Sequence, residues 1–175
     1  MFADPVKILK IFGLKENDIV ADLGAGTGFY AIAAGSMVPK GRVYAVEVIK
    51  DYLMTVKNKA REAHLNNVEC LWGDIEKIGG TKIKDQIVDA VIASNVLFQV
   101  ENKDNFIKET KRILKEDGRV LFIDWLPESP AVISGASRGI AKNRAREMFE
   151  KNGFVWVQDI SAGTHHYGMI LKNNI

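Results

Sequence analysis

The stretch Asp22-Leu23-Gly24-Ala25-Gly26-Thr27-Gly28, residues 22–28, holds three glycines in seven positions. It directly follows the apolar run Ile19-Val20-Ala21, which is typical of a buried strand. Glycine has no Cβ, so a glycine-rich turn lets another group approach the main chain closely. The stretch therefore predicts a buried strand followed by a turn that contacts a ligand.

Strand-like apolar runs alternate with segments of helical period along the rest of the chain. This alternation is typical of an α/β fold, in which helices flank a parallel sheet. We expect strands at Ile19–Leu23, Val43–Val48, Val68–Trp72, Val88–Ser94, Arg119–Trp125, Phe154–Asp159 and Gly168–Lys172. We expect helices at Phe29–Met37, Asp51–Ala63, Asp104–Leu114 and Ser137–Lys151, the last one capped by Ser137. Between Ile75 and Gln86 we expect a loop or one helical turn.

The composition is that of an ordinary globular protein, with 47% hydrophobic and 26% charged residues. A chain of 175 residues has room for one domain, and we expect residues 1–175 to form it. The net charge of +2 is too small to indicate a nucleic-acid or anionic-membrane partner. No apolar run approaches the ~20 residues that span a bilayer. Because Met1–Lys10 also lacks the features of a secretory signal, we expect a cytoplasmic protein.

Polar residues stand at or near the ends of five successive predicted strands. In an open α/β sheet the ligand binds outside the carboxyl ends of the strands, where the strand order reverses. Helix capping explains each of these residues singly, but it explains all of them together less well. They therefore predict one crevice. The residues are Asp22, Glu47, Asp74, Ser94, Asn95 and Asp124.

Two kinds of ligand suit the glycine turn. Residues Gly26–Ala31 fit the G-x-G-x-x-A pattern of dinucleotide sites, and an acidic residue, Glu47, follows at nearly the right distance. However, the Asp22 carboxylate would oppose the doubly negative pyrophosphate of a nicotinamide dinucleotide. S-adenosylmethionine instead carries an ammonium and a sulfonium, which a carboxylate attracts. Charge therefore favours S-adenosylmethionine.

At this point the sequence resembles a family. Val20–Gly28 is similar to the first motif of the class I S-adenosylmethionine-dependent methyltransferases, and the resemblance continues in order over nearly the whole chain. The subgroup that it resembles is the small-molecule and quinone type, of the methyltransferase-11 and -25 kind. The resemblance implies a Rossmann-like, doubly wound sheet of seven mainly parallel strands, with helices on both faces and the last strand antiparallel. The further motifs are Val43–Glu47, Gly73–Ile75, Val88–Leu97, Ile113–Arg119 and His166–Gly168.

The resemblance also implies roles for single residues toward S-adenosylmethionine as cofactor. The three glycines would admit the methionyl portion, and Asp22 would organise its ammonium group. Glu47 would accept hydrogen bonds from both ribose hydroxyls, and Asp74 would accept one from the adenine amine. Phe29 or Tyr30 would either wall the cofactor or pack in the core. The cofactor-binding residues so implied are Asp22, Gly24, Ala25, Gly26, Thr27, Gly28, Glu47, Val48, Gly73, Asp74, Ile75, Ser94 and Asn95.

Methyl transfer from a sulfonium is a direct displacement, which depends mainly on alignment and needs a base only for a protonated acceptor. Asp124 and His166 are the candidate catalytic residues. The alternatives are a strand-end cap for Asp124 and a structural histidine for His166. We expect no metal site, because the adjacent side chains of His165 and His166 would point to opposite faces of a strand. A cofactor-binding regulatory module without turnover and a nicotinamide-dependent reductase stay open as alternative functions.

The sequence limits the methyl acceptor to a small-molecule or lipid-like compound. The thiol chemistry of the similar arsenite methyltransferases needs several cysteines, and this chain has one, Cys70. Ser94–Leu97 also lacks the Asn/Asp-Pro-Pro-Tyr pattern of the enzymes that methylate amino groups of nucleic acids. Arg138, Lys142 and Arg146 recur every four residues, either to attract an anionic acceptor or as a solvated helix face. A homo-oligomer stays open.

Overall fold

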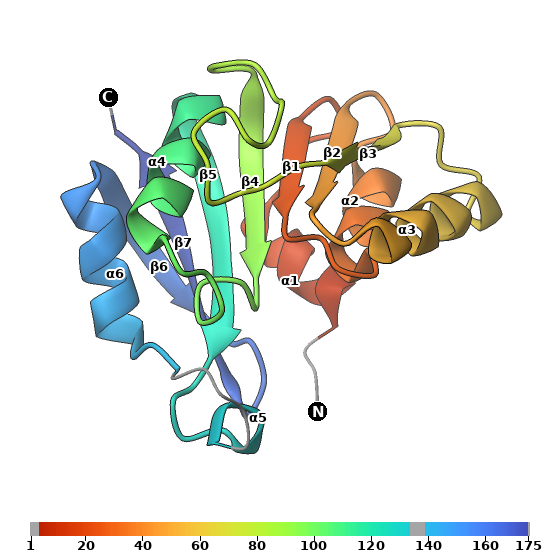
Figure 1. Ribbon diagram of the computed structural model, residues 1–175. Coiled ribbons are helices and arrows are strands. Elements are labelled where there is room, and N and C mark those ends of the chain that lie inside the picture. Colours follow the sequence, from red (N-terminus) through yellow and green to blue (C-terminus); the bar gives the residue numbers. More distant parts are fainter. Residues whose placement is uncertain (1–3, 134–138, 175) are drawn as a thin grey trace.

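The computed structural model describes residues 4–133 and 139–174, which form a seven-stranded sheet with helices on both faces (Figure 1). The strand order is β3-β2-β1-β4-β5-β7-β6. β7 runs antiparallel to both of its neighbours, and the other pairs are parallel. The predicted fold class is thereby confirmed. The strands are β1 (Ile19–Leu23), β2 (Arg42–Glu47), β3 (Val68–Trp72), β4 (Val88–Ser94), β5 (Leu114–Trp125), β6 (Phe154–Ile160) and β7 (His166–Asn173).

Two apolar layers hold the helices on the sheet. The layer formed with α1, α2 and α3 includes Leu9 and Val56, and the layer formed with α4 and α6 includes Phe106 and Phe149. In Figure 1, α4 and α6 lie in front of the sheet. Within the described ranges, no helix is long and apolar enough to cross a membrane. The helices are α1 (Pro5–Phe12), α2 (Phe29–Met37), α3 (Lys50–Glu62), α4 (Lys103–Ile113), α5 (Pro130–Ile133) and α6 (Lys142–Lys151).

β1 and β4 are neighbours at the centre of the sheet, and the chain proceeds from them in opposite directions. This is the point where the strand order reverses, so a crevice is expected at the carboxyl ends of these two strands. Side chains alternate between the faces of a strand. In β1, Ala21 and Leu23 pack in the α4–α6 layer and Val20 packs in the α1–α3 layer. Asp22 therefore lies on the α1–α3 side, at the end of the strand.

Several predicted elements have the predicted bounds, namely β1, β3, β4 and α2. β5 begins earlier than predicted because Leu114 pairs with Val88 ahead of a bulge in the ladder. β7 begins at His166 because this residue pairs with Trp125. The segment between Ile75 and Gln86 contains turns and neither a helix nor a strand, as predicted.

One helical prediction needs correction, and one helix was not predicted. The last helix begins at Lys142, after an extended Ala141, so the helix predicted over Ser137–Lys151 is too long. The predicted cap, Ser137, lies outside the described residues. α1 was not predicted from the sequence, although its signals are local. Asp4 accepts a hydrogen bond from the Val6 N–H at 2.9 Å, and Gly13 ends the helix with a left-handed backbone.

Candidate functional site

A cleft of about 640 Å³ lies at the carboxyl ends of the central strands. It is lined by residues of β1 and its turn, β2, β4, β5 and β7 and by the segment that follows β3, as the strand-end prediction requires. Predicted cofactor residues form most of the lining, together with His166, whereas Gly28 and Asp124 are not part of it. Their contacts with a ligand stay a prediction. The predicted residues that line the cleft are Asp22, Gly24, Ala25, Gly26, Thr27, Glu47, Val48, Gly73, Asp74, Ile75, Ser94, Asn95 and His166.

The three glycines of the turn serve three different purposes. All have positive φ, which favours glycine. A Cβ on Gly26 would have no protein atom within 4 Å, so this residue opens directly onto the cleft. A Cβ on Gly24 would lie 2.7 Å from the Val96 side chain, and one on Gly28 would lie 3.0 Å from Val56. Gly28 therefore allows close packing of α2 against α3, and its predicted contact with the ligand stays a prediction.

Glu47 ties the turn after β1 to the end of β2. Its carboxylate is buried and accepts three main-chain hydrogen bonds. One comes from the Gly26 N–H to Oε2 at 2.9 Å, and two come from Val48 and Ile49 to Oε1 at 2.8 and 3.0 Å. A carboxylate offers about four acceptor positions. The remaining position is on Oε2, so one hydroxyl of a diol can donate there without displacing an N–H group.

Asp22 is 3% exposed and lies next to Glu47 at the cleft. Burial, together with the smaller effect of the Glu47 charge, raises the pKa of Asp22 to about 7, against a hydrogen bond from the Ala31 main chain. A cation bound beside Asp22 would lower this pKa again, because it stabilises the carboxylate. The site therefore fits a positively charged ligand better than a phosphate.

Asp74 follows β3 and is partly exposed. Its Oδ1 accepts the Glu76 N–H at 3.0 Å, and its Oδ2 pairs with the Lys77 ammonium at 2.9 Å. The Lys77 and Glu76 hydrogen bonds lower the pKa of Asp74, so the carboxylate is ionised near neutral pH. We call this side of the cleft the acidic half. It consists of the glycine turn with Asp22, Glu47, Asp74, Ile75 and Glu76.

The adjoining part of the cleft, at the ends of β4 and β5 and the start of β7, holds no ionised carboxylate, lysine or arginine among the described residues that line it. We call this part the neutral half. Asn95 has a left-handed backbone, and its N–H donates to the Ile123 carbonyl at 2.8 Å. Its buried side-chain oxygen has no protein hydrogen-bond partner in the described structure. The neutral half consists of Ser94, Asn95, Val96, Gln99, Val100, Ile123, Ala162 and His166.

His166 lies at the start of β7, where its side chain faces the cleft. The imidazole packs on the Trp125 indole, with ring centroids 3.9 Å apart, and the residue is 8% exposed. Burial lowers the pKa of His166, and the neighbouring His165 lowers it further. A neutral imidazole at pH 7 can take up a proton.

Asp124 does not face the cleft, which corrects its predicted position beside the acceptor. It is fully buried and lies on the opposite face of β5 from Ile123, which lines the cleft. Its oxygens accept the Phe98 N–H at 3.0 Å and the Trp125 N–H at 2.8 Å. Burial raises the pKa of Asp124 to about 7 against these hydrogen bonds. The geometry is that of a cap that fixes the segment after β4.

Other residues that line the cleft were not predicted from the sequence. Val96, Gln99 and Val100 have helical spacing, which marks them as one face of a turn. Ala162 had no local signal, because the β6–β7 pairing brings it to the cleft. Phe29 and Tyr30 both line the cleft, and Tyr30 also packs against the α1–α3 layer of the core.

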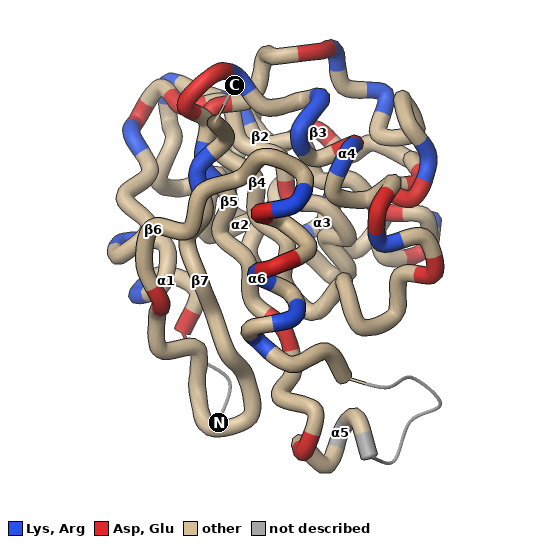
Figure 2. The backbone as a smooth tube through the Cα atoms, turned by 90° about the vertical axis from the view of Figure 1, so that its left-hand side faces the viewer, with Lys and Arg blue, Asp and Glu red and all other residues tan. Residues whose placement is uncertain are grey.

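The basic residues of α6 are largely paired with acidic ones. Lys142 pairs with Asp159, and Arg146 pairs with Glu150 at 2.8 Å and lies over the Trp156 ring at 4.5 Å. Figure 2 shows basic and acidic positions interspersed along this helix. Arg138 lies outside the described residues. The solvated-face interpretation therefore holds for Lys142 and Arg146.

The fold and the cleft define the class of S-adenosylmethionine-dependent methyltransferases with a Rossmann-like sheet. A solved structure of this class, a SAM-dependent methyltransferase from Aquifex aeolicus, superposes with a TM-score of 0.85 and 28% identity, covering 98% of this chain and 89% of that one. The family model of the methyltransferase domain matches residues 14–153. The chain belongs to this family, and S-adenosylmethionine is its cofactor.

Two curated relatives illustrate the range of the family. Demethylmenaquinone methyltransferase of Lactobacillus johnsonii is 26% identical over 201 residues, which cover 95% of this chain and 81% of the relative. Human arsenite methyltransferase is 31% identical over 117 residues, which cover 62% of this chain. The chain spans only about a third (31%) of the length of that relative.

Proposed function

We propose that this protein transfers the methyl group of S-adenosylmethionine to a small, uncharged or lipid-like acceptor. One observation carries the proposal. An acidic half suited to a positively charged nucleoside and a neutral half suited to an uncharged compound adjoin in one cleft. A methyl donor and its acceptor need such adjoining sites, because the displacement requires the two reacting atoms in line.

The acidic half would hold the cofactor. We place the ammonium group beside Asp22, the ribose at the unoccupied acceptor position of Glu47, and the adenine beside Asp74 and Ile75. When bound, S-adenosylmethionine supplies an electrophilic methyl group on a sulfonium. The N–H groups at the start of α2 can take its carboxylate.

The neutral half would align the acceptor and exclude water. Asn95 Oδ1 can accept a hydrogen bond from the acceptor, since it has no partner among the described protein groups. His166 would accept the proton from an acceptor that attacks through a hydroxyl group. Its lowered pKa keeps the imidazole neutral and ready for that role.

The residues that line the neutral half support the proposed class of uncharged or lipid-like acceptors. An anionic acceptor would find no lysine or arginine in that part of the described structure to pair with. Demethylmenaquinone, the acceptor named for one relative, is uncharged and lipid-like, and a compound of this chemical type fits the neutral half. The single thiol, Cys70 in β3, does not line the cleft, which argues against thiol-based arsenite chemistry.

Calorimetric titration with S-adenosylmethionine, its demethylated product S-adenosylhomocysteine, and NADH tests the cofactor site. We expect heat from the first two ligands only, and binding of NADH alone would contradict the proposal. Turnover is then measured as release of S-adenosylhomocysteine with a panel of uncharged hydroxylated, quinol-type and anionic acceptors. A protein that binds the cofactor but releases none of its product with any acceptor is a regulatory module rather than an enzyme.

A further inference from the structure

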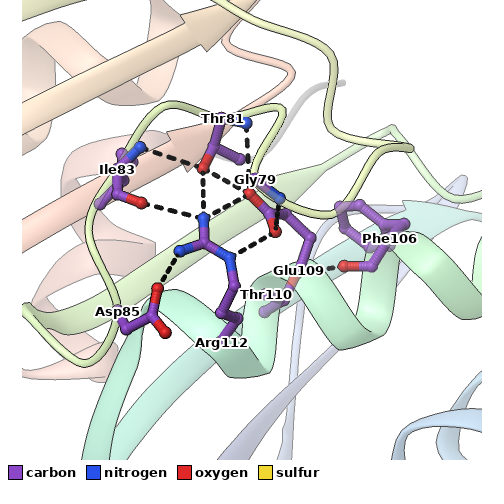
Figure 3. Close-up of polar contacts among 8 residues, drawn as sticks. All are labelled: Gly79, Thr81, Ile83, Asp85, Phe106, Glu109, Thr110 and Arg112. Atoms are coloured by element: carbon purple, nitrogen blue, oxygen red, sulfur yellow. Dashed lines mark hydrogen bonds and ion pairs between the residues drawn. The ribbon is translucent and has the colours of Figure 1, made fainter.

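A buried ion pair on α4 holds the loop that follows β3. Glu109 is fully buried, and Arg112 donates to both of its oxygens, from Nε to Oε2 and from Nη2 to Oε1, at 2.7 Å each (Figure 3). Arg112 Nη2 also donates to the Ile83 carbonyl at 2.9 Å. Burial alone would raise the pKa of Glu109, but the hydrogen bonds from Arg112, Thr81 and Gly79 together lower it. The carboxylate is therefore ionised and fully occupied.

Glu109 accepts hydrogen bonds from the two residues that flank Gly80. The Gly79 N–H donates to Oε2 at 2.8 Å, and Thr81 donates to Oε1 from its N–H at 3.2 Å and its hydroxyl at 2.6 Å (Figure 3). None of Gly79, Thr81 and Glu109 lines the cleft. The pair thus acts on the cleft only through the loop.

Gly80, which lies between the two residues that Glu109 holds, is hydrogen-bonded to Asp74 of the acidic half. Its carbonyl accepts the Asp74 N–H at 3.0 Å, and its N–H donates to the Lys77 carbonyl at 2.8 Å. The contact is close, since a Cβ on Gly80 would lie 2.1 Å from the Asp74 carbonyl oxygen. α4 also holds the middle of the loop, because Asn105 Nδ2 donates to the Glu76 carbonyl at 3.2 Å. The main chain around Asp74 is thereby held by residues that lie outside the cleft lining, namely Gly80 and Asn105.

We propose that Glu109, Arg112 and Thr81 are positioning residues that set the affinity for the nucleoside end of the cofactor without touching it. The inference rests on the proposed placement of adenine beside Asp74 and Ile75. Affinity falls in proportion to the fraction of molecules whose loop holds the binding arrangement. Loss of the hydrogen bonds that Glu109 accepts from Gly79 and Thr81 therefore weakens binding of any ligand that carries adenosine.

Thr81→Val and Thr81→Ser form the central test, because both keep the main-chain N–H. Valine keeps nearly the same volume without the hydroxyl, whereas serine keeps the hydroxyl and lacks one methyl group. Calorimetry with S-adenosylhomocysteine and with adenosine is expected to show about tenfold weaker binding for Thr81→Val. Thr81→Ser should bind within about twofold of wild type. Glu109→Gln should weaken binding more than Thr81→Val, and Glu147→Gln, which changes an exposed carboxylate on α6, serves as its matched control.

Amide hydrogen exchange of the ligand-free protein gives a second measurement. Thr81→Val should speed exchange at Asp74 and Gly80, whereas a purely global loss of stability would speed exchange throughout and leave affinity at 25 °C unchanged. If Glu109→Gln does not fold, the Thr81 pair decides alone. If the wild type binds both ligands and Thr81→Val binds them equally tightly, this inference alone is overturned. A wild type that binds neither ligand overturns the proposed function as well.

Discussion

The two halves of the cleft are built in different ways. In the acidic half, Glu47 and Asp74 are held by main-chain N–H groups of the same or a neighbouring turn. In the neutral half, polar side chains stand among apolar ones, and Asn95 Oδ1 lacks a partner among the described residues. Under the proposed function, recognition of the cofactor is largely formed by the backbone before the ligand binds, whereas recognition of the acceptor depends on a few side chains. The comparison can be tested half by half.

The largest effect is expected from Glu47→Ala in the acidic half. The variant removes the acceptor of three main-chain N–H groups, so the turn after β1 and the end of β2 keep only their main-chain hydrogen bonds to the Val46 carbonyl. We expect S-adenosylhomocysteine affinity to fall about 100-fold, or about 3 kcal/mol. Glu69→Ala on the neighbouring strand removes an exposed carboxylate and is the control. A loss below threefold in Glu47→Ala would show that this half does not depend on the hydrogen bonds that Glu47 accepts.

In the neutral half, His166→Asn should separate turnover from cofactor binding. We expect kcat to fall about 100-fold with a hydroxyl acceptor, because a positioned base typically contributes this much. The affinity for S-adenosylhomocysteine should stay within about twofold. The wild-type kcat should also rise with pH through the lowered pKa of His166, and the variant should lose this limb. Equal losses of kcat and cofactor affinity would contradict the division of the cleft into a cofactor half and an acceptor half.

The pH dependence of binding reports on Asp22. Its pKa of about 7 in the free protein means that it is protonated at pH 5, whereas a bound cation requires the carboxylate. Affinity for S-adenosylhomocysteine should therefore rise between pH 5 and pH 7, by at most about tenfold per unit, and level off above. Calorimetry should show a weaker pH dependence for Asp22→Asn. An unchanged slope in this variant would assign the proton to another group.

The same group makes a prediction about the stability of the ligand-free protein. The pKa of Asp22 is raised by folding from 3.8 to about 7. Its favourable contribution is fully present below pH 3.8 and is lost as pH rises through 7. Asp22→Asn should therefore unfold at a higher temperature than wild type at pH 8, with a smaller difference at pH 5. A variant that is less stable than wild type at pH 8 would contradict the burial argument.

The smallest effects are expected from the glycines of the turn. Gly28→Ala should lower the free energy of unfolding by about 1–2 kcal/mol, because of its positive φ and the contact with Val56. It should leave cofactor affinity nearly unchanged. Gly26→Ala should weaken cofactor binding more than it weakens folding, because its Cβ would project into open space at the cleft. Thermal unfolding and calorimetry on the two variants would reveal a reversed pattern, which would contradict the assigned roles.

Local patterns predicted the acidic half well. A glycine turn after an apolar run and acidic strand ends are features of short segments, and parallel strands bring their carboxyl ends together. The neutral half depends on pairing at a distance. Ala162 reaches the cleft only through the β6–β7 and β5–β7 ladders. No local pattern of one sequence contains that register.

Asp124 shows a second limit. Its place near a strand end was predicted, but the face on which its side chain lies was not. Both faces of β5 are covered by helices, so Leu121, Phe122 and Ile123 are all apolar and hide the alternation of the strand. In a strand with one solvated face, the polar residues would have shown which face Asp124 occupies.

The hairpin of β6 and β7 has a consequence for how this protein could diversify. It contributes Ala162 and His166 to the cleft, yet in the sheet it pairs only with β5 and forms the outer edge of the molecule. If the proposed division of the cleft is right, exchanging this C-terminal segment for that of another family member should alter which compound is methylated and leave adenosine binding intact. Chimeric proteins with the junction ahead of β6 would then keep one cofactor site and differ in acceptor selectivity.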